Sequence, residues 1–170
     1  MEGTIREVKK GSSIKIINTG TPKCLWYHSL ELEVLIYSST AHDYHILDGK
    51  VPEMLMTRPA AYISHIYEYA WFDWVMFCDG PHVSYPDNNL VIGRYLGPTL
   101  DVGPAMCAKI LKKNGKVFPR STLRTLTRKE IDSPMHKEQR RQFVTSIMAC
   151  LGPAAMAGEF YEDHAKPVYE

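Results

Sequence analysis

The run WFDWVMF at 71–77 decides the fold class, because aromatic and β-branched residues crowd into a segment of strand length. A second run of this character, LVIGRYLG, follows at 90–97. Two more runs, 105–113 and 116–126, flank the dipeptide Asn114-Gly115. Asn-Gly between such runs is the strongest short hairpin signal. The four segments therefore predict a small antiparallel β unit of four or five strands.

Tight turns and short strands favour a small SH3-like barrel for this unit, although an open meander fits the pattern equally well. Gly93 interrupts the second strand and indicates either a β-bulge or a point where another part of the chain approaches closely. Trp71, Phe72, Trp74 and Phe77 should alternate between two faces of the first strand. Core packing is the expected role of these aromatic side chains, and stacking on nucleic-acid bases is the alternative.

Helical patterns lie on both sides of the β unit. Residues 2–17 are amphipathic, and a second helix should run from 22 to about 39, with Thr21 as N-cap and Pro22 at its first position. Residues 134–151 place Phe143, Ile147 and Leu151 in one apolar stripe. Because helices and strands are segregated along the chain, the expected class is α+β. The expected units are a helical segment at 1–60, a connector at 61–70, the β domain at 71–128, a helix at 129–152 and a flexible tail at 153–170.

Several side chains have an expected environment. Glu31 and Glu33 should mark the solvated side of the second helix. Cys24 and Cys150 should be buried thiols on helix core faces. The polar cluster His42, Asp43, His45 and Asp48 has no zinc-site spacing and is expected in a loop. The four cysteines are far apart and no apolar window reaches 18 residues, which predicts reduced thiols, no membrane span, and a nuclear or cytoplasmic location.

Charge is distributed unevenly along the chain, although its net charge is only +1. Residues 24–90 carry two bases and nine acids, whereas residues 91–128 carry eight bases and one acid. The two blocks therefore differ sharply, at −7 and +7. Such asymmetry suggests a polyanionic partner for the basic block, and an ordinary lysine-rich β surface is the alternative.

The chain resembles the integrases of copia-like long-terminal-repeat retrotransposons over residues 2 to about 145. The most specific part is the run IGRYLGPTLDVGPAMCAKILKKNGKVFPRST at 92–122. The other matching stretches are EGTIREVKKG at 2–11, PKCLWYHSLELE at 22–33, SSTAHD at 38–43, DGKVPEMLMT at 48–57 and WFDWVMF at 71–77. The resemblance implies that residues 1 to about 60 are the last helices of a truncated RNase H-like catalytic core. Residues 71–127 would be the SH3-like domain that follows this core.

The resemblance also implies a role for Glu2. Integrases of this family hold two Mg²⁺ ions with two aspartates and a final glutamate, and Glu2 matches that glutamate by position. Both aspartates would precede the segment matched here. Because one carboxylate cannot hold two metal ions, the chain alone is expected to be inactive and to carry no cofactor. Tyr27 also departs from the family, in which an aspartate usually follows the tryptophan matching Trp26.

The basic block then becomes a candidate interface for DNA without sequence preference. Arg120, Thr122 and Arg124 should alternate on one face of a strand, and cations about 7 Å apart match the spacing of backbone phosphates. The candidate residues are Arg94, Lys109, Lys112, Lys113, Lys116, Arg120, Arg124 and Arg128. Alternatives are a protein-interaction or self-association module, with the apolar stripe of Leu25, Trp26, Leu30 and Leu35 exposed or covered by a partner such as the missing core, or a non-functional relic.

Overall fold

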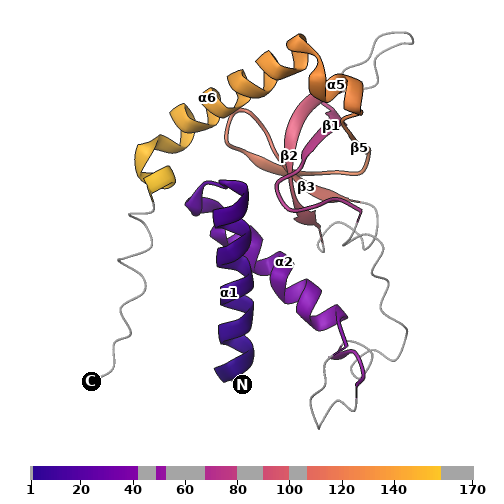
Figure 1. The fold of residues 1–170 in the computed structure, drawn as a ribbon, viewed down its shortest axis with the longest axis vertical. Coiled ribbons are helices and arrows are strands. Elements are labelled where there is room, and N and C mark those ends of the chain that lie inside the picture. The colour runs from indigo at the N-terminus through magenta and orange to yellow at the C-terminus, as the bar shows by residue number, and fades with distance from the viewer. Residues whose placement is uncertain (1, 42–48, 53–67, 80–89, 100–106, 158–170) are drawn as a thin grey trace.

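The computed structural model describes residues 2–41, 49–52, 68–79, 90–99 and 107–157. Within them it has four α-helices, a 3-10 turn and one five-stranded antiparallel sheet (Figure 1). The predicted α+β class is therefore confirmed. The polar cluster from His42 to Asp48 and most of the predicted tail lie outside the described residues.

Two antiparallel helices form the N-terminal part of the chain. Helix α1 spans Glu2–Thr19, a 3-10 turn spans Lys23–Leu25, and helix α2 spans Trp26–Ser39. Gly20 ends α1 in the left-handed region at φ 62°, which glycine adopts without a Cβ penalty. The predicted N-cap at Thr21 is wrong, because no side chain caps the turn at Pro22. The Thr21 hydroxyl instead accepts a hydrogen bond of 3.0 Å from Trp71 Nε1.

The sheet has the strand order β4-β3-β2-β1-β5. The turn at Asn114-Gly115 connects β3 to β4 as predicted, with Gly115 at φ 76° and a 2.9 Å bond from Lys112 N–H to Lys116 O. The first strand begins three residues later than predicted, because Trp71 and Phe72 form a turn in which Phe72 has φ 64°. The strands are β1 at Trp74–Cys78, β2 at Leu90–Pro98, β3 at Ala108–Leu111, β4 at Val117–Arg120 and β5 at Leu123–Thr125.

The predicted single strand at 116–126 is divided in two. It breaks at Ser121 and Thr122, after which β5 pairs with β1 while β4 pairs with β3. Local alternation of residues carries no information about which strand becomes the neighbour, so the pattern did not reveal this break. Pro119 lies in β4, at the end of the strand order, where a missing N–H costs no ladder bond.

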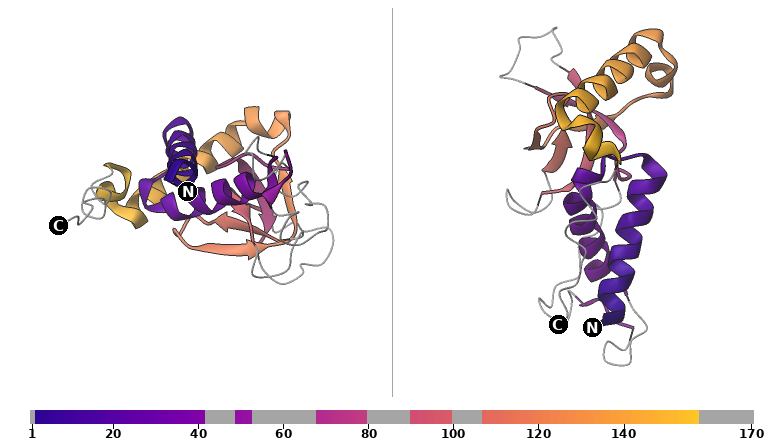
Figure 2. Two further views of the ribbon diagram at one scale, coloured as in Figure 1. Left: turned by 90° about the horizontal axis from the view of Figure 1, so that it is seen from below. Right: turned by 90° about the vertical axis from the view of Figure 1, so that its left-hand side faces the viewer.

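Alternate residues of β1 enter two hydrophobic clusters. Val75 and Phe77, both fully buried, pack with Tyr95, Ala108 and Ile110 on one face of the sheet. The other face packs against α2 and α6 (Figure 2) and carries the larger cluster. Its members are Leu25, Leu32, Trp71, Phe72, Met76, Ile92, Leu96, Leu111, Leu126, Phe143 and Ile147. Phe77, Trp71 and Phe72 thus have the core role expected of the aromatic run.

Two helices follow the sheet, α5 at Arg128–Asp132 and α6 at Pro134–Ala157. The predicted α6 stripe is found, with Phe143 and Ile147 buried and Leu151 partly buried. Gly152 breaks the helical geometry at φ 78°, as expected, but helical backbone resumes and continues to Ala157. The prediction of a buried thiol at Cys150 is wrong, since this residue is exposed, and Cys24 is only half-buried.

Candidate nucleic-acid interface

Five of the eight cations predicted to contact DNA have partners inside the protein. These partners are carboxylates from outside the basic block, or aromatic rings and a backbone carbonyl. The other three cations are exposed. The paired residues are Arg94, Lys109, Lys112, Arg120 and Arg124, and the exposed ones are Lys113, Lys116 and Arg128.

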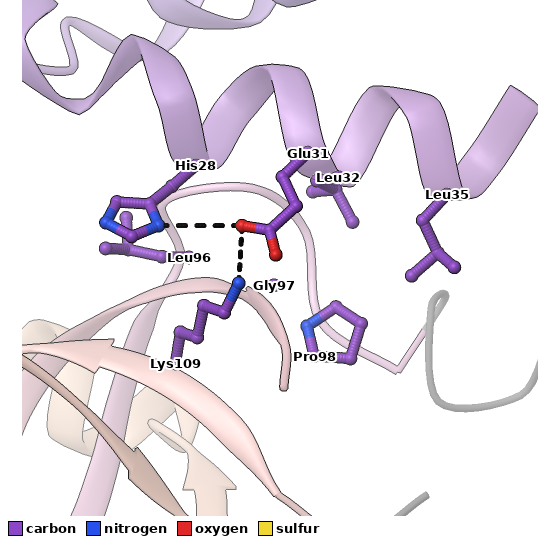
Figure 3. Close-up of a pocket in the computed structure, with 8 residues that line it drawn as sticks. All are labelled: His28, Glu31, Leu32, Leu35, Leu96, Gly97, Pro98 and Lys109. Carbon is purple, nitrogen blue, oxygen red and sulfur yellow. Dashed lines mark ion pairs between the residues drawn. The ribbon is translucent and has the colours of Figure 1, made fainter. Parts of the chain in front are cut away.

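Lys109 joins the sheet to the helix pair. Its Nζ lies 2.5 Å from Glu31 Oε2 on α2, and His28 Nδ1 lies 3.8 Å from the same oxygen (Figure 3). The Lys109 side chain is only 13% exposed. A cavity with room for about one water molecule adjoins the three residues. Glu31 therefore faces the sheet, and the prediction that it marks the solvated side of α2 is wrong.

Glu33, the second acid of this helix, is also paired. It forms an ion pair with Lys15 of α1, and its side chain is 20% exposed. The same physical reason applies to both glutamates, since α2 lies between α1 and the sheet and each glutamate pairs with a lysine of one of these two neighbours. A partly buried lysine on each side, Lys15 or Lys109, supplies the counter-charge.

Asp79 holds the end of β1 against the β3–β4 hairpin. It accepts a hydrogen bond from Lys112 Nζ and lies 3.4 Å from Arg120 Nη2. Arg120 Nε also donates to Cys78 O at 3.2 Å. The Phe118 ring packs under both cations, at 4.2 Å from Lys112 Nζ and 4.3 Å from Arg120 Cζ. The hydrogen bond from Lys112 keeps the pKa of Asp79 below its ordinary value.

Arg124 and Arg94 are held in different ways. Arg124 donates two hydrogen bonds to Glu130, at 2.8 and 2.6 Å, and the N–H of Thr127 donates to the same carboxylate. These bonds, that from Arg124 foremost, lower the pKa of Glu130. The Arg94 guanidinium lies 3.4 Å from the centre of the Trp74 ring and donates to Phe72 O at 2.6 Å. Burial lowers the pKa of Arg94 to about 10.

The expected row of Arg120, Thr122 and Arg124 does not exist as one strand face. Arg120 ends β4 and Arg124 lies in β5, at opposite ends of the strand order, while Thr122 lies between the strands. Each arginine is bound to its own carboxylate. The even spacing of cations, which had suggested a match to phosphates, is therefore absent.

Lys113 and Lys116 remain available to a ligand. Both are exposed at the β3–β4 turn, and neither forms an ion pair with any residue that the structure describes. Arg128, the first residue of α5, is likewise exposed and unpaired among those residues. Sequence reasoning missed that two acids of the acidic block, Glu31 and Asp79, pair with three cations of the basic block, Lys109, Lys112 and Arg120, although the opposite signs of the two blocks were a signal for it.

Glu2 lies in the first turn of α1. Within the described ranges, no three His, Cys, Asp or Glu side chains gather into a group suited to a metal ion. None of the helices in those ranges is long and apolar enough to cross a membrane. Comparisons with protein-family models, with curated proteins and with solved structures find no match to the chain.

The cluster of His28, Glu31 and Lys109 predicts that the protein loses stability on mild acidification. Burial lowers the pKa of His28, Lys109 lowers it further, and Glu31 opposes both effects. The unfolded chain, with a histidine pKa of about 6.5, therefore binds the proton more readily than the folded protein. Stability should be highest above that value and fall as pH decreases towards the lower folded pKa.

Thermal unfolding followed by circular dichroism between pH 8 and 5.5 measures this effect. The His28→Gln variant should lose that part of the pH dependence due to His28, while the other histidines remain as an internal control. Parallel pH profiles for the wild type and the variant would contradict the assignment.

Proposed function

We propose that the chain is a non-catalytic C-terminal part of a copia-like retrotransposon integrase, which contacts the DNA backbone through the tip of its β3–β4 hairpin. Two observations support this proposal: the resemblance over residues 2 to about 145, and the order of a helix pair followed by a small antiparallel sheet. Such a role in DNA integration places the chain in the nucleus or the cytoplasm. Glu2 supplies one carboxylate, and a two-metal centre needs several.

We also propose that the sheet closes into an SH3-like barrel. In the order β4-β3-β2-β1-β5, the last strand returns to pair beside the first. The bonds of Arg120 to Cys78 O and to Asp79 connect β4 with the end of β1, although β3 and β2 separate these strands in the ladder. Strong curvature of the sheet accounts for both contacts, and such curvature is typical of a small barrel.

The observation that carries DNA contact is the pair of exposed cations at the hairpin tip. Lys113 and Lys116 flank Asn114-Gly115 and have no carboxylate partner among the described residues. A phosphate can approach them without breaking an internal ion pair, whereas Lys109, Lys112 or Arg124 would have to exchange one anion for another. Two lysines hold phosphates as point charges and read no base edges. The expected binding is weak and independent of sequence.

The Lys113→Glu/Lys116→Glu double variant should bind duplex DNA about tenfold more weakly than the wild type at 50 mM salt. Its plot of log affinity against log salt should be shallower by about two units, because two phosphate contacts are lost. Fluorescence anisotropy with a labelled duplex between 50 and 200 mM salt measures both quantities.

The Arg6→Glu/Lys10→Glu variant is the matched control, since it reverses two exposed cations on α1. Both double variants change the net charge by the same amount. Any difference between their DNA affinities therefore reports on the position of the charges. Equal losses of affinity in both, or wild-type binding that does not respond to salt, would refute the hairpin as the DNA contact.

A protein-interaction module is the second candidate. Large apolar side chains on the helix pair are exposed, with Trp26 at 42%, Tyr27 at 58% and Val34 at 51%. Leu25, by contrast, is buried against the sheet cluster. The expected apolar stripe of α2 is thus divided, with part of it inside the protein and part open to a partner.

A further inference from the structure

The two N-terminal helices touch closely where the middle of α1 meets the beginning of α2, and they diverge towards the start of α1. Ser12 and Ser29 are both buried at the contact, and their hydroxyls are 3.1 Å apart. Small side chains allow the two backbones to approach here. In Figures 1 and 2 the first turns of α1 and the last turns of α2 extend away from the sheet.

A groove of about 320 Å³ lies between the diverging turns. Its walls are mainly apolar, with Ile5 and Val8 from α1 and Leu30, Val34 and Tyr37 from α2. Ile5 shares a helical face with Val8, Ser12 and Ile16, which are all buried, yet Ile5 itself is 56% exposed. The contact face of α1 therefore continues past the point where α2 has moved away.

The rim of the groove is basic. Lys9 is one of the lining residues, and Arg6 and Lys10 are exposed on the same turns of α1. Residues 3–10 hold these three cations and one acid, Glu7. Residues 34–39 of α2 contain no charged side chain, so the opposite wall does not neutralise the rim.

We propose that this groove receives an amphipathic helix of a partner protein, with an apolar stripe that enters the groove and acidic residues that face α1. An apolar groove between helices binds such a helix through side chains spaced at i, i+3, i+4 and i+7. Arg6, Lys9 and Lys10 form no ion pair with any residue that the structure describes, and their charge specifies acidic residues beside this stripe. Nucleic acid is a poor occupant, because its charged phosphates would lose water in the groove and gain no favourable contact with the apolar walls. The inference goes beyond the proposed function and uses a surface separate from the hairpin.

Two synthetic peptides of about 18 residues test the proposal. Both carry leucine at the helix spacing i, i+3, i+4 and i+7; one has glutamate at the flanking positions and the other has lysine. Fluorescence anisotropy with the full chain should show binding of the glutamate peptide and at least about tenfold weaker binding of the lysine peptide. The Lys9→Glu variant should reduce the difference in affinity between the glutamate peptide and the lysine peptide.

Val34→Asp should abolish binding of the glutamate peptide, because it places an unpaired carboxylate on the apolar wall. Val34 is exposed, so the fold tolerates the change, and circular dichroism checks this. Ile17→Asp is the matched control, because Ile17 is 73% exposed on α1 and does not line the groove. It should bind the peptide as the wild type does, and so should Lys113→Glu/Lys116→Glu.

Several results would overturn the proposal. They are equal binding of the two peptides, failure of both to bind, and equal losses for Val34→Asp and Ile17→Asp. Light scattering coupled to size exclusion tests for another occupant: a dimer that Val34→Asp dissociates would identify a second copy of the chain.

Discussion

Leu32→Ala is expected to lower the free energy of unfolding by about 2–5 kcal/mol, the range found when a buried leucine is truncated and leaves a cavity. Leu32 is 5% exposed and belongs to the cluster that joins α2 to the sheet. Its side chain lies against Gly97 of β2, where an added Cβ atom would be 3.5 Å from Leu32 Cδ1. Because one cluster contains residues of the helix pair, the sheet and α6, the variant should still unfold in a single transition at lower urea concentration.

Val34→Ala is the matched control on the same helix. Val34 is half-exposed and outside the cluster, so its truncation should change stability by no more than about 0.5 kcal/mol. Urea unfolding measured in parallel by tryptophan fluorescence and circular dichroism separates the two cases. If Leu32→Ala produced two separate transitions, or cost no more than Val34→Ala, the helix pair would not be part of a common core.

Gly93→Ala is expected to destabilise the protein by about 1–3 kcal/mol, as overpacking of a dense core does. A Cβ atom at Gly93 would lie 2.7 Å from Ile110 Cγ2, 2.8 Å from Phe77 Cε1 and 3.0 Å from Leu111 O. Ile110 and Phe77 are fully buried, and the third atom belongs to the backbone of β3. The added methyl group can therefore be accommodated only if strands of the sheet move apart.

Gly3→Ala is the opposite case and serves as the control. No atom lies within 4 Å of a Cβ at Gly3, which is in α1. Alanine should raise helix stability there by up to about 1 kcal/mol. Thermal unfolding of the two variants should therefore move the midpoint in opposite directions. If Gly93→Ala left the midpoint of thermal unfolding unchanged, the packing between β2 and β3 at this point would be loose.

Local patterns predicted most elements of the fold. The 3.6-residue period at 134–151 indicated the buried stripe of α6, and Asn114-Gly115 indicated the β3–β4 turn. For Gly93 the sequence left two alternatives, a β-bulge or a close approach by another part of the chain. The structure shows the close approach, by Ile110, Phe77 and the backbone of Leu111. The register of β1 and β2 is regular at Val75 and Gly93, and the only shift recorded in the described part of the sheet lies between Tyr95 and Pro98.

The candidate site was harder to predict because pairing of charges is a long-range property. Glu31 and Lys109 are 78 positions apart, and no spacing rule connects them. Thr21 shows the same limit on a smaller scale. It has the residue type of an N-cap, but it bonds to Trp71 across 50 positions. At Glu31 and Thr21, contacts with residues distant in the sequence outweighed the role that the local pattern indicated.

The bond between Thr21 and Trp71 has a consequence for any ligand that engages both ends of the molecule. It fastens the connection between α1 and α2 to the beginning of the β module, within the shared hydrophobic cluster. The groove and the tip of the β3–β4 hairpin are therefore held at a fixed distance from each other. Two sites joined by a flexible linker would instead vary in their separation. A bivalent ligand of matching span would gain avidity without a new contact, and one of the wrong span would gain nothing.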